Sequence, residues 1–397
     1  MRIAISGASG FVGQQLVPVL RGKGVDLLLI SREPAKLRDL FPECSSCGVS
    51  QVSLRGQGCD LLVHFSGRNN NQAGGQDDFD AANVAFALQV LRHARSAGIR
   101  RFIYVSSVHA LDPSNCSAYA ESKRRGATAL LEAAEDVEVS ILYLPVVHSD
   151  AFAGKLAVLN HLPLRLRGAA FQVLASLRPT VSIDRIAAFL ASGAPAGNGE
   201  RLILSNAQMG CIVYAAVMRL VDYAFALTVI LFFWWVLVAA WLAIKCETRG
   251  PGFFGQTRIG RLGRSFTCWK LRTMHVGTAQ VGTHEVAASA VTRVGAFLRR
   301  TRIDELPQVW NILRGEMALI GPRPCLPVQT QLIQERQARG ILSILPGISG
   351  LAQVEEIDMR DPVVLARREA EYLMLRGILL DIRLVLRTAG LVSRAGL

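Results

Sequence analysis

Residues 2–13, Arg2-Ile-Ala-Ile-Ser-Gly7-Ala-Ser-Gly10-Phe-Val-Gly13, are a short apolar run followed by three spaced glycines. The apolar run predicts a buried strand, and the residues after Gly10 have the apolar spacing of a helix. A second apolar stretch, residues 25–30, completes a strand–helix–strand unit. Glycines at such a turn let backbone N–H groups approach a pyrophosphate, whose charge a helix N-terminus favours. Gly7, Gly10 and Gly13 therefore predict a dinucleotide site, with a tight structural turn as the alternative.

The residues that follow the second strand bear on the choice of dinucleotide. They are Ser31-Arg32-Glu33. An acidic residue at this strand end would accept the ribose hydroxyls of NAD(H), whereas Arg32 suits the 2′-phosphate of NADP(H). Because Glu33 lies one place late, we expect NADP(H), and NAD(H) stays open.

Two further segments predict parallel strands, residues 60–65 and Arg101–Ser107, and the second ends in hydroxyls. Twelve residues later Tyr119-Ala-Glu-Ser-Lys123 opens a helix, and positions i and i+4 share a helical face. A nearby ammonium lowers the pKa of a phenol, so Tyr119 could exchange a proton with a substrate carbonyl while Ser107 holds that oxygen. The alternative is a surface Tyr–Lys pair.

Taken together, residues 1 to about 206 resemble the extended short-chain dehydrogenase/reductase family, which includes nucleotide-sugar epimerases, dehydratases and 4-keto reductases. Asn83, in Ala-Ala-Asn-Val, and Thr180-Val-Ser-Ile-Asp184 match further landmarks. The resemblance implies an α/β domain over residues 1–207, built on a doubly wound parallel Rossmann sheet, with Asn83 at the cofactor.

By the same resemblance, the catalytic residues are Ser107, Tyr119 and Lys123. The stretch 154–164 is most similar to reductases that act on UDP-2-acetamido-4-keto-6-deoxyhexoses. We therefore expect reduction of a UDP-4-keto-6-deoxy-N-acetylhexosamine. An epimerase, or a non-catalytic nucleotide-sensing domain that regulates the rest of the chain, is the alternative.

The composition joins basic charge to high hydrophobicity. The 397 residues include 44 Lys and Arg against 31 Asp and Glu, a net charge of +13, yet the mean hydropathy is +0.31. Only 19% of residues are charged, which argues against a nucleic-acid-binding protein, and 51% are hydrophobic, which excludes disorder. Residues 245–397 hold 22 basic and 13 acidic residues, so the C-terminal part is the more basic. Lipid phosphate or an anionic membrane surface is the expected partner.

A membrane segment is predicted by Tyr223 to Ile244, which are 22 residues without a charge. A helix of about 33 Å can cross a bilayer, with a buried soluble helix as the alternative. The basic residues that follow place the C-terminal side in the cytoplasm. The nucleotide domain can lie on the same side only if the segment 208–249 enters the membrane and returns to the side from which it came. Such a re-entrant segment needs a break in its helix, and the backbone groups that the break frees must find hydrogen-bond partners. No Pro or Gly lies between 211 and 249, so the sequence shows no position for the break.

The most reactive pair in the remaining sequence is Asp304-Glu305, which follows Arg299, Arg300 and Arg302 within a helical apolar pattern. Such a carboxylate could attack phosphorus as a nucleophile, while Mg²⁺ and arginines neutralise the phosphate oxygens. A surface ion-pair face is the alternative. RNA is disfavoured because no aromatic platform or nucleic-acid module accompanies the basic residues, so we expect no nucleic acid partner.

Several long motifs accompany this pair in order: Gly250-Pro-Gly-Phe-Phe-Gly, Phe266-Thr-Cys-Trp-Lys270-Leu-Arg272-Thr-Met274, Gly321-Pro-Arg323-Pro324 and Pro346-Gly-Ile-Ser-Gly-Leu-Ala-Gln353. From about Arg219 to Thr388 the chain resembles the bacterial sugar transferases, the monotopic phosphoglycosyl transferases. The resemblance implies a small, helix-rich α/β catalytic domain over 250–397, on the cytoplasmic face of the bacterial inner membrane.

It further implies that Asp304 attacks the β-phosphorus of a UDP-sugar, releases UMP, and passes the phosphosugar to undecaprenyl phosphate. Glu305 would help bind Mg²⁺. Substrate phosphates would be contacted by Arg299 and Arg323, with Lys270, Arg272 and Gln353 as further candidates. The membrane helix of the family is kinked by Ser-Pro, whereas Trp234-Trp235 stands there in this chain. The oligomeric state stays open, a homo-oligomer included.

Overall fold

The computed structural model describes residues 1–397 except 70–71, 150–151, 153, 194–198, 279–289 and 391–397. The chain divides into two compact units. The first holds Met1–Ala175 and Pro179–Gly210, and the second holds Ser176–Arg178 and the described residues of 211–394.

The strands of the first unit are β1 (Arg2–Ser6), β2 (Asp26–Ser31), β3 (Ser45–Gly48), β4 (Leu61–His64), β5 (Arg101–Ser107), β6 (Glu138–Leu144), β7 (Val146–His148), β8 (Thr180–Ser182) and β9 (Arg201–Ile203). Its helices are α1 (Phe11–Gly22), α2 (Pro34–Leu40), α3 (Val52–Arg55), α4 (Gln76–Asp80), α5 (Phe86–Ser96), α6 (Ala118–Glu132), α7 (Leu164–Leu177) and α8 (Ile183–Ala191), with shorter turns η1 (Val49–Gln51), η2 (Ala81–Ala85), η3 (Val108–Leu111) and η4 (Gly154–His161).

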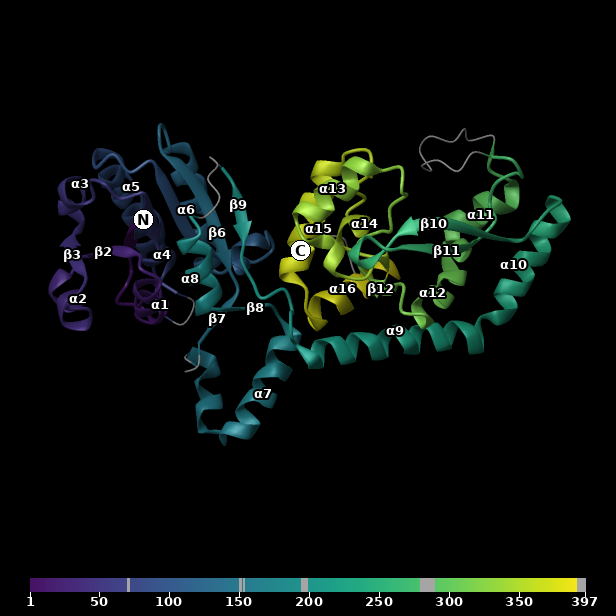
Figure 1. Ribbon diagram of the computed structural model, residues 1–397, viewed down its shortest axis with the longest axis horizontal. Helices are drawn as coiled ribbons and strands as arrows, with labels where there is room; N and C mark the ends of the chain where they lie inside the picture. Colours follow the sequence, from purple (N-terminus) through teal and green to yellow (C-terminus); the bar gives the residue numbers. More distant parts are fainter. Residues whose placement is uncertain (70–71, 150–151, 153, 194–198, 279–289, 391–397) are drawn as a thin grey trace. The chain divides into compact units, whose positions relative to one another are not determined.

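A parallel seven-stranded sheet in the order β3-β2-β1-β4-β5-β6-β9 forms the centre of this unit (Figure 1). On one face the core contains Leu16 of α1 and Ile186 of α8, and on the other it contains Val90 of α5 and Leu130 of α6, all fully buried. Parallel neighbours need crossover helices, which therefore cover both faces. The predicted doubly wound Rossmann sheet is confirmed.

The helices of the second unit are α9 (Ile212–Phe232), α10 (Trp234–Glu247), α11 (Arg293–Thr301), α12 (Val309–Leu313), α13 (Thr330–Ala338), α14 (Leu351–Val354), α15 (Pro362–Leu375) and α16 (Ile378–Thr388). Its strands are β10 (Phe253–Ile259), β11 (Ser265–Leu271), β12 (Ala318–Ile320) and β13 (Gly347–Ser349), with turns η5 (Arg261–Gly263), η7 (Ile303–Gln308) and η8 (Ile341–Ser343). β10 and β11 pair antiparallel, and β12 and β13 pair parallel. The predicted small, helix-rich α/β unit is confirmed.

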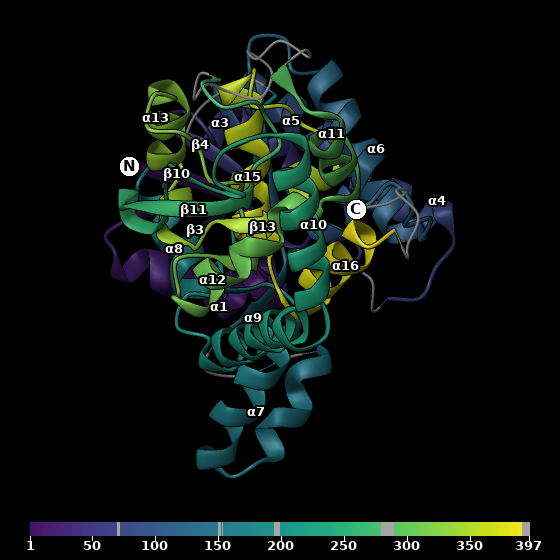
Figure 2. The ribbon, with the colours of Figure 1, turned by 90° about the vertical axis from the view of Figure 1, so that its right-hand side faces the viewer.

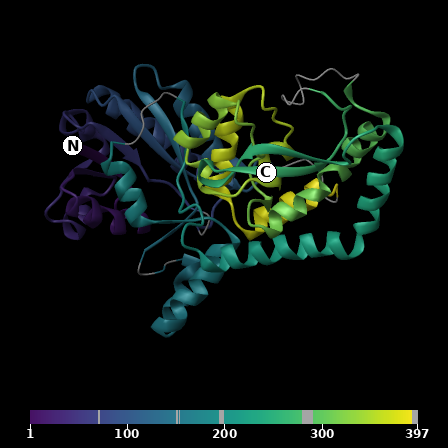
Figure 3. The ribbon, with the colours of Figure 1, turned by 45° about the vertical axis from the view of Figure 1, so that its right-hand side comes forward.

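The long apolar segment is two helices, so the prediction of one helix over 223–244 is wrong. Phe233 separates α9 from α10 with φ −116° and ψ 9°, and α10 turns sharply away from α9 there (Figure 3). The break lies directly before Trp234-Trp235, the first two residues of α10. The Trp235 indole Nε1 donates to the Phe232 carbonyl oxygen at 3.0 Å. This bond satisfies a backbone acceptor at the end of α9.

Both helices pack on the second unit through a narrow stripe. Ala226 and Val229 of α9 join one core cluster, while Ala240 and Ile244 of α10 join another. Their other faces expose large apolar side chains, and α9 is long and apolar enough to cross a membrane.

Candidate active sites

The Asp304-Glu305 pair lies in a turn between two helices. Helix α11 starts where Thr292 Oγ1 accepts a hydrogen bond from the Gly295 N–H at 2.8 Å. It ends at Arg302, whose left-handed backbone (φ 58°, ψ 15°) is uncommon for a residue with a side chain. Turn η7 follows and carries both carboxylates. The expectation that they lie within one apolar-patterned helix is therefore wrong, because Arg302 redirects the chain just before them.

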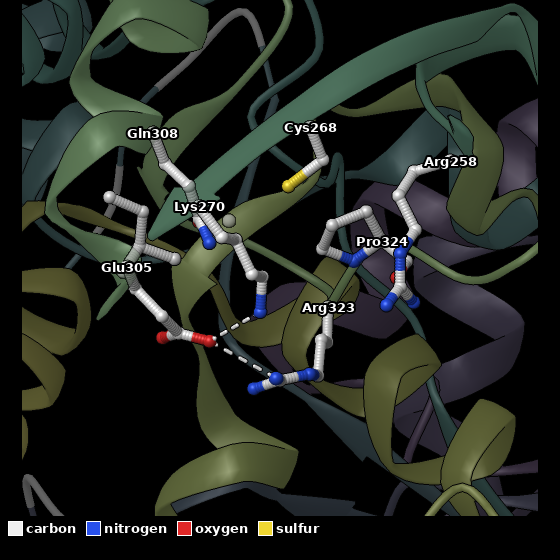
Figure 4. A pocket seen from close by; sticks show the side chains of 9 residues that line it. Arg258, Cys268, Lys270, Glu305, Gln308, Arg323 and Pro324 are labelled. Atoms are coloured by element: carbon white, nitrogen blue, oxygen red, sulfur yellow. Dashed lines mark hydrogen bonds and ion pairs between the residues drawn. The ribbon is translucent and has the colours of Figure 1, made fainter. Parts of the chain in front are cut away.

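Glu305 is paired with two cations from different elements (Figure 4). Its Oε1 accepts from Lys270 Nζ of β11 at 2.9 Å and from Arg323 Nη2, which follows β12, at 3.1 Å. Burial acts to raise the pKa of Glu305, but the charges of Lys270 and Arg323 outweigh burial and hold it at about 2. Glu305 is therefore ionised at neutral pH.

Asp304 differs from its neighbour although it too is buried. Within the described part of the chain its carboxylate has no hydrogen-bond or ion-pair partner. Burial, together with the charge of Glu305, raises the pKa of Asp304 to about 6, against the opposing charges of Lys270, Arg299 and Arg323. An unpaired, desolvated carboxylate beside fixed cations has the properties of a nucleophile for a phosphate ester.

Glu305 and its two cationic partners line a pocket, and Asp304, the next residue in the chain, is not part of the lining. The lining residues are Arg258, Cys268, Lys270, Glu305, Gln308, Arg323, Pro324, Gly347 and Ile348. Sequence reasoning missed Arg258, whose Nη1 donates to the Pro324 carbonyl at 3.0 Å. Strand alternation could have found it. Gln256 pairs with Cys268 across the β10–β11 hairpin, so Arg258 and Lys270, two places along each strand, share the same face of the hairpin.

The other predicted phosphate contacts are placed differently. Arg299 donates through Nε to Thr273 Oγ1 at 2.9 Å, and its charge reaches Asp304. Arg272 donates to the carbonyls of Thr248 and Arg249, at 3.2 and 3.1 Å, so it ties the end of α10 to β11 and does not line the pocket.

Gln353 also lies outside the pocket lining. Its Nε2 donates to the Gly321 carbonyl at 3.4 Å, in the loop that carries Arg323. The structure thus brings Asp304, Glu305, Lys270 and Arg323 together, whereas Gln353 contacts only the backbone of the loop that carries Arg323.

The residues at this site suit Mg²⁺ in one specific way. No cluster of three or more His, Cys, Asp or Glu is present in the described residues, so they contain no all-protein cage. Mg²⁺ commonly takes one or two carboxylates and completes its shell with water and substrate phosphates. The ionised Glu305 is such a donor.

The glycine turn of the first unit, called the glycine cradle below, packs too closely against neighbouring backbone for side chains at Gly7 and Gly13. Gly7 has φ +89°, and a Cβ there would lie 2.6 Å from the Ser66 nitrogen. A Cβ on Gly13 would lie 2.4 Å from the Ala8 Cα. Gly10 caps the N-terminus of α1. The glycines thus hold a tight turn directly at the N-terminus of α1, a position whose dipole favours a pyrophosphate and so fits a dinucleotide.

Arg32 and Asn83 border the same region in different ways. Arg32 is exposed after β2, with its guanidinium 5.3 Å from the centroid of the Phe86 ring. Asn83 is buried in the π-helical turn η2; its Oδ1 accepts from the Arg68 N–H and its Nδ2 donates to Ser122 Oγ, both at 2.9 Å. Asn83 thus holds the loop after β4 against α6.

The predicted catalytic trio is only partly assembled. Tyr119 hydrogen-bonds Ser107; burial raises the pKa of Tyr119, and this bond opposes the rise. Lys123 Nζ donates to the Val105 carbonyl at 3.0 Å, and burial lowers the pKa of Lys123 to about 8. The structure therefore joins Ser107 to Tyr119 and places Lys123 against β5.

The two sites define a chain that joins a nucleotide-binding Rossmann domain to a sugar-transferase domain. Residues 213–395 match the family described as bacterial sugar transferase, and residues 3–149 match the NAD dependent epimerase/dehydratase family. The chain belongs to the bacterial sugar transferase family, with an epimerase/dehydratase-type domain before it.

Among similar curated proteins, the UDP-glucose:undecaprenyl-phosphate glucose-1-phosphate transferase of Caulobacter vibrioides is 39% identical over 186 residues, which are 43% of this chain and 67% of that protein. The UDP-N-acetylgalactosamine-undecaprenyl-phosphate N-acetylgalactosaminephosphotransferase of Aeromonas hydrophila is 34% identical over 187 residues, 44% of this chain and 43% of that protein. The chain thus spans about two thirds of one relative and under half of the other.

Among solved structures, UDP-glucuronic acid 4-epimerase from Bacillus cereus is 14% identical, with a TM-score of 0.41, covering 52% of this chain and 77% of that one.

Proposed function

We propose that the second unit is an undecaprenyl-phosphate phosphoglycosyl transferase that works through a covalent aspartyl-phosphosugar. The observation that carries this proposal is the contrast between the two adjacent carboxylates: Asp304 is unpaired and Glu305 is paired twice. Family membership and the relatives that act on UDP-sugars and undecaprenyl phosphate support the same reaction.

In the first step a carboxylate oxygen of Asp304 attacks the β-phosphorus of the UDP-sugar. The bond from that phosphorus to the bridging oxygen breaks, and UMP leaves with this oxygen. In the second step a phosphate oxygen of undecaprenyl phosphate attacks the same phosphorus. The aspartyl–phosphorus bond breaks, which returns Asp304 and gives the lipid diphosphosugar.

The surrounding cations would stabilise the charge that develops on the phosphate oxygens. Arg258, Lys270 and Arg323 line the pocket, and Arg299 acts on Asp304 from beside it. Glu305 would hold Mg²⁺, which would supply further neutralisation of phosphate charge.

The membrane side of the proposal rests on α9 and α10. Both expose apolar side chains, and the break at Phe233 has its Phe232 carbonyl satisfied by Trp235. We infer a re-entrant segment that keeps both units on the cytoplasmic face of the bacterial inner membrane. On that side both units have access to the UDP-sugars and nicotinamide cofactors of the cytoplasm.

For the first unit, we propose reduction of a UDP-4-keto-6-deoxy-N-acetylhexosamine, which would supply the donor for the transferase. The glycine cradle would bind NADP(H) or NAD(H), which supplies the hydride. Tyr119 would donate its phenolic proton to the C4 oxygen as that oxygen becomes a hydroxyl, while Ser107 holds the same oxygen. Arg32 would face the 2′-phosphate of NADP(H).

A second candidate for the first unit is a nucleotide-sensing domain without catalysis. The observation that favours it is the hydrogen bond from Lys123 to the Val105 carbonyl. The ammonium of Lys123 is not among the groups that lower the pKa of Tyr119, which burial raises. An epimerase is a third reading of the same glycine cradle and Tyr119.

The transferase is tested by mass spectrometry of the lipid made from defined UDP-sugars and undecaprenyl phosphate. We expect a lipid diphosphosugar with the wild-type chain and none with Asp304→Asn. Asp358→Asn is the matched control, because it changes an exposed carboxylate in the same way, and it should give the lipid product. Lipid product from Asp304→Asn would contradict the mechanism.

The reductase is tested by following NADPH absorbance with the 4-keto sugar nucleotide. We expect consumption that Tyr119→Phe abolishes while lipid transfer continues. No consumption by the wild-type chain would contradict the reductase and leave the epimerase and the sensing domain as the candidates.

A further inference from the structure

A helical hairpin formed by η4 and α7 projects from the first unit between β7 and β8 (Figure 2). Among the described residues, side chains on only one side of the hairpin pack against the rest of the first unit. The Phe171 ring packs on the rings of Phe152 and His148, with centroid distances of 5.0 and 4.6 Å. Ala175, one helical turn further on, is buried on the same side. This side of α7 is therefore fixed to its own unit.

The opposite side of α7 is an exposed apolar stripe. Leu166, Ala169 and Val173 stand at i, i+3 and i+7, which share one helical face. Leu166 is 57% exposed and Val173 is 51% exposed. A surface helix normally turns polar side chains away from its docked face. On η4, Val158 is exposed as well, at 64%.

The charges around the stripe identify what would cover it. Residues 157–178 contain no Asp or Glu and three basic residues, Arg165, Arg167 and Arg178. An apolar stripe flanked only by cations suits a bilayer surface with anionic headgroups. A second copy of the hairpin fits poorly, because like charges would then face each other.

The C-terminal end of α7 adds a second, independent observation. Residues Ser176–Arg178 count with the second unit. There Leu177 packs with Cys211 and Tyr214, at the start of α9. The hairpin thus ends beside the helix that is long and apolar enough to cross a membrane.

We propose that the hairpin 154–177 lies on the surface of an anionic bilayer, with Leu166 and Val173 inserted among the lipids. The first unit would then touch the membrane directly instead of hanging from α9 alone. This inference rests on the insertion of α9 stated above, and the experiment separates the two.

The test uses the full chain in phosphatidylcholine–phosphatidylglycerol vesicles that carry nitroxide-labelled lipid. Cys116→Ser and Cys246→Ser first remove the two exposed thiols found among the described residues. A fluorophore is then attached at Val173→Cys, with Leu231→Cys on α9 as the positive control and Leu54→Cys on α3 as the negative control, both exposed apolar positions.

We expect quenching of about twofold or more at 173 and 231, and none at 54. Arg165→Gln should weaken the quenching at 173 in these vesicles and leave it unchanged in pure phosphatidylcholine. Quenching at 231 without quenching at 173 would overturn the hairpin inference alone, and so would disulfide-linked dimers through position 173. Absence of quenching at 231 would instead contradict the insertion of α9.

Discussion

Asp304 and Glu305 are neighbours in the chain, yet their carboxyl groups have opposite electrostatics. The pKa of Asp304 is raised to about 6, first by burial, and that of Glu305 is lowered to about 2 by Lys270 and Arg323 despite burial. Lys270 Nζ lies 2.9 Å from Glu305 Oε1 and so is committed to Glu305. One carboxylate is thereby a fixed anion, and the other is free to react.

This contrast predicts that Asp304 destabilises the fold when it is ionised. Because its folded-state pKa lies above the ordinary value of 3.8, the stability of the protein falls as pH rises through about 6. Asp304→Asn should raise the free energy of unfolding near pH 8 by about 1–3 kcal/mol. The gain should vanish at about pH 4, where the native Asp304 is protonated. Denaturant unfolding of metal-free protein at the two pH values measures this, and an equal effect at both would contradict it.

Arg258 and Arg272 should respond differently to the same change. Arg258→Gln removes a cation that lines the pocket, so we expect kcat/KM of the transferase to fall by about 100-fold. Arg272→Gln removes bonds to the carbonyls of residues 248 and 249, so it should lower the thermal midpoint and leave KM for the UDP-sugar unchanged. Equal kinetic losses from both variants would show that Arg258 has no special place in the site.

The indole of Trp235 should contribute more to the free energy of unfolding than the indole of Trp234. Both rings are 58% exposed, but Trp235 alone of the two donates to the Phe232 carbonyl within the described residues. Trp235→Phe should therefore cost about 0.5–1.5 kcal/mol of unfolding free energy in detergent, and Trp234→Phe should cost less. Calorimetry of the two variants compares them, and identical midpoints would refute the role of the bond.

The cofactor cradle should reject a methyl group at Gly13. A Cβ there would meet backbone atoms at 2.4 Å, whereas at Gly22, in the last turn of α1, it would meet nothing within 4 Å. Gly13→Ala should therefore abolish nicotinamide nucleotide binding, measured by the fluorescence of bound NADPH, and Gly22→Ala should bind normally. Tight binding by Gly13→Ala would place the nucleotide elsewhere.

A buried ion pair supports the loop that carries Arg323. Arg336 Nε donates to Glu369 Oε2 at 2.8 Å and Arg336 Nη2 donates to the Arg323 carbonyl at 2.9 Å. Arg336→Met should cost about 3–5 kcal/mol, because it leaves the carboxylate of Glu369 buried without a partner. Adding Glu369→Leu should recover most of that loss in denaturant unfolding. No recovery would mean that the bond to the Arg323 backbone dominates.

Secondary-structure elements could be predicted from the sequence where the local apolar pattern matches the residues that are buried in the fold. Arg101–Ser107 is a strand with the predicted bounds, and the glycine turn leads into α1 as expected. The families of both units were also identified from their motifs.

What the sequence could not show depends on contacts between distant residues. The helix break at Phe233 has no Pro or Gly; an indole bond to the Phe232 carbonyl and the packing of α9 and α10 on separate clusters accompany it. Arg302 likewise has a left-handed backbone conformation, which residues other than glycine seldom adopt and which its identity therefore does not predict. The place of Arg258 in the pocket follows from the pairing of β10 with β11, which no single motif reveals.

The central claim, that Asp304 carries the phosphosugar, is tested most directly by peptide mass spectrometry after incubation with a UDP-sugar and no lipid acceptor. We predict one phosphosugar adduct on the peptide that contains residues 303–308, localised to Asp304, with release of one equivalent of UMP. Adding undecaprenyl phosphate should remove the adduct. UMP release that depends on undecaprenyl phosphate, with no adduct at any stage, would contradict the covalent mechanism.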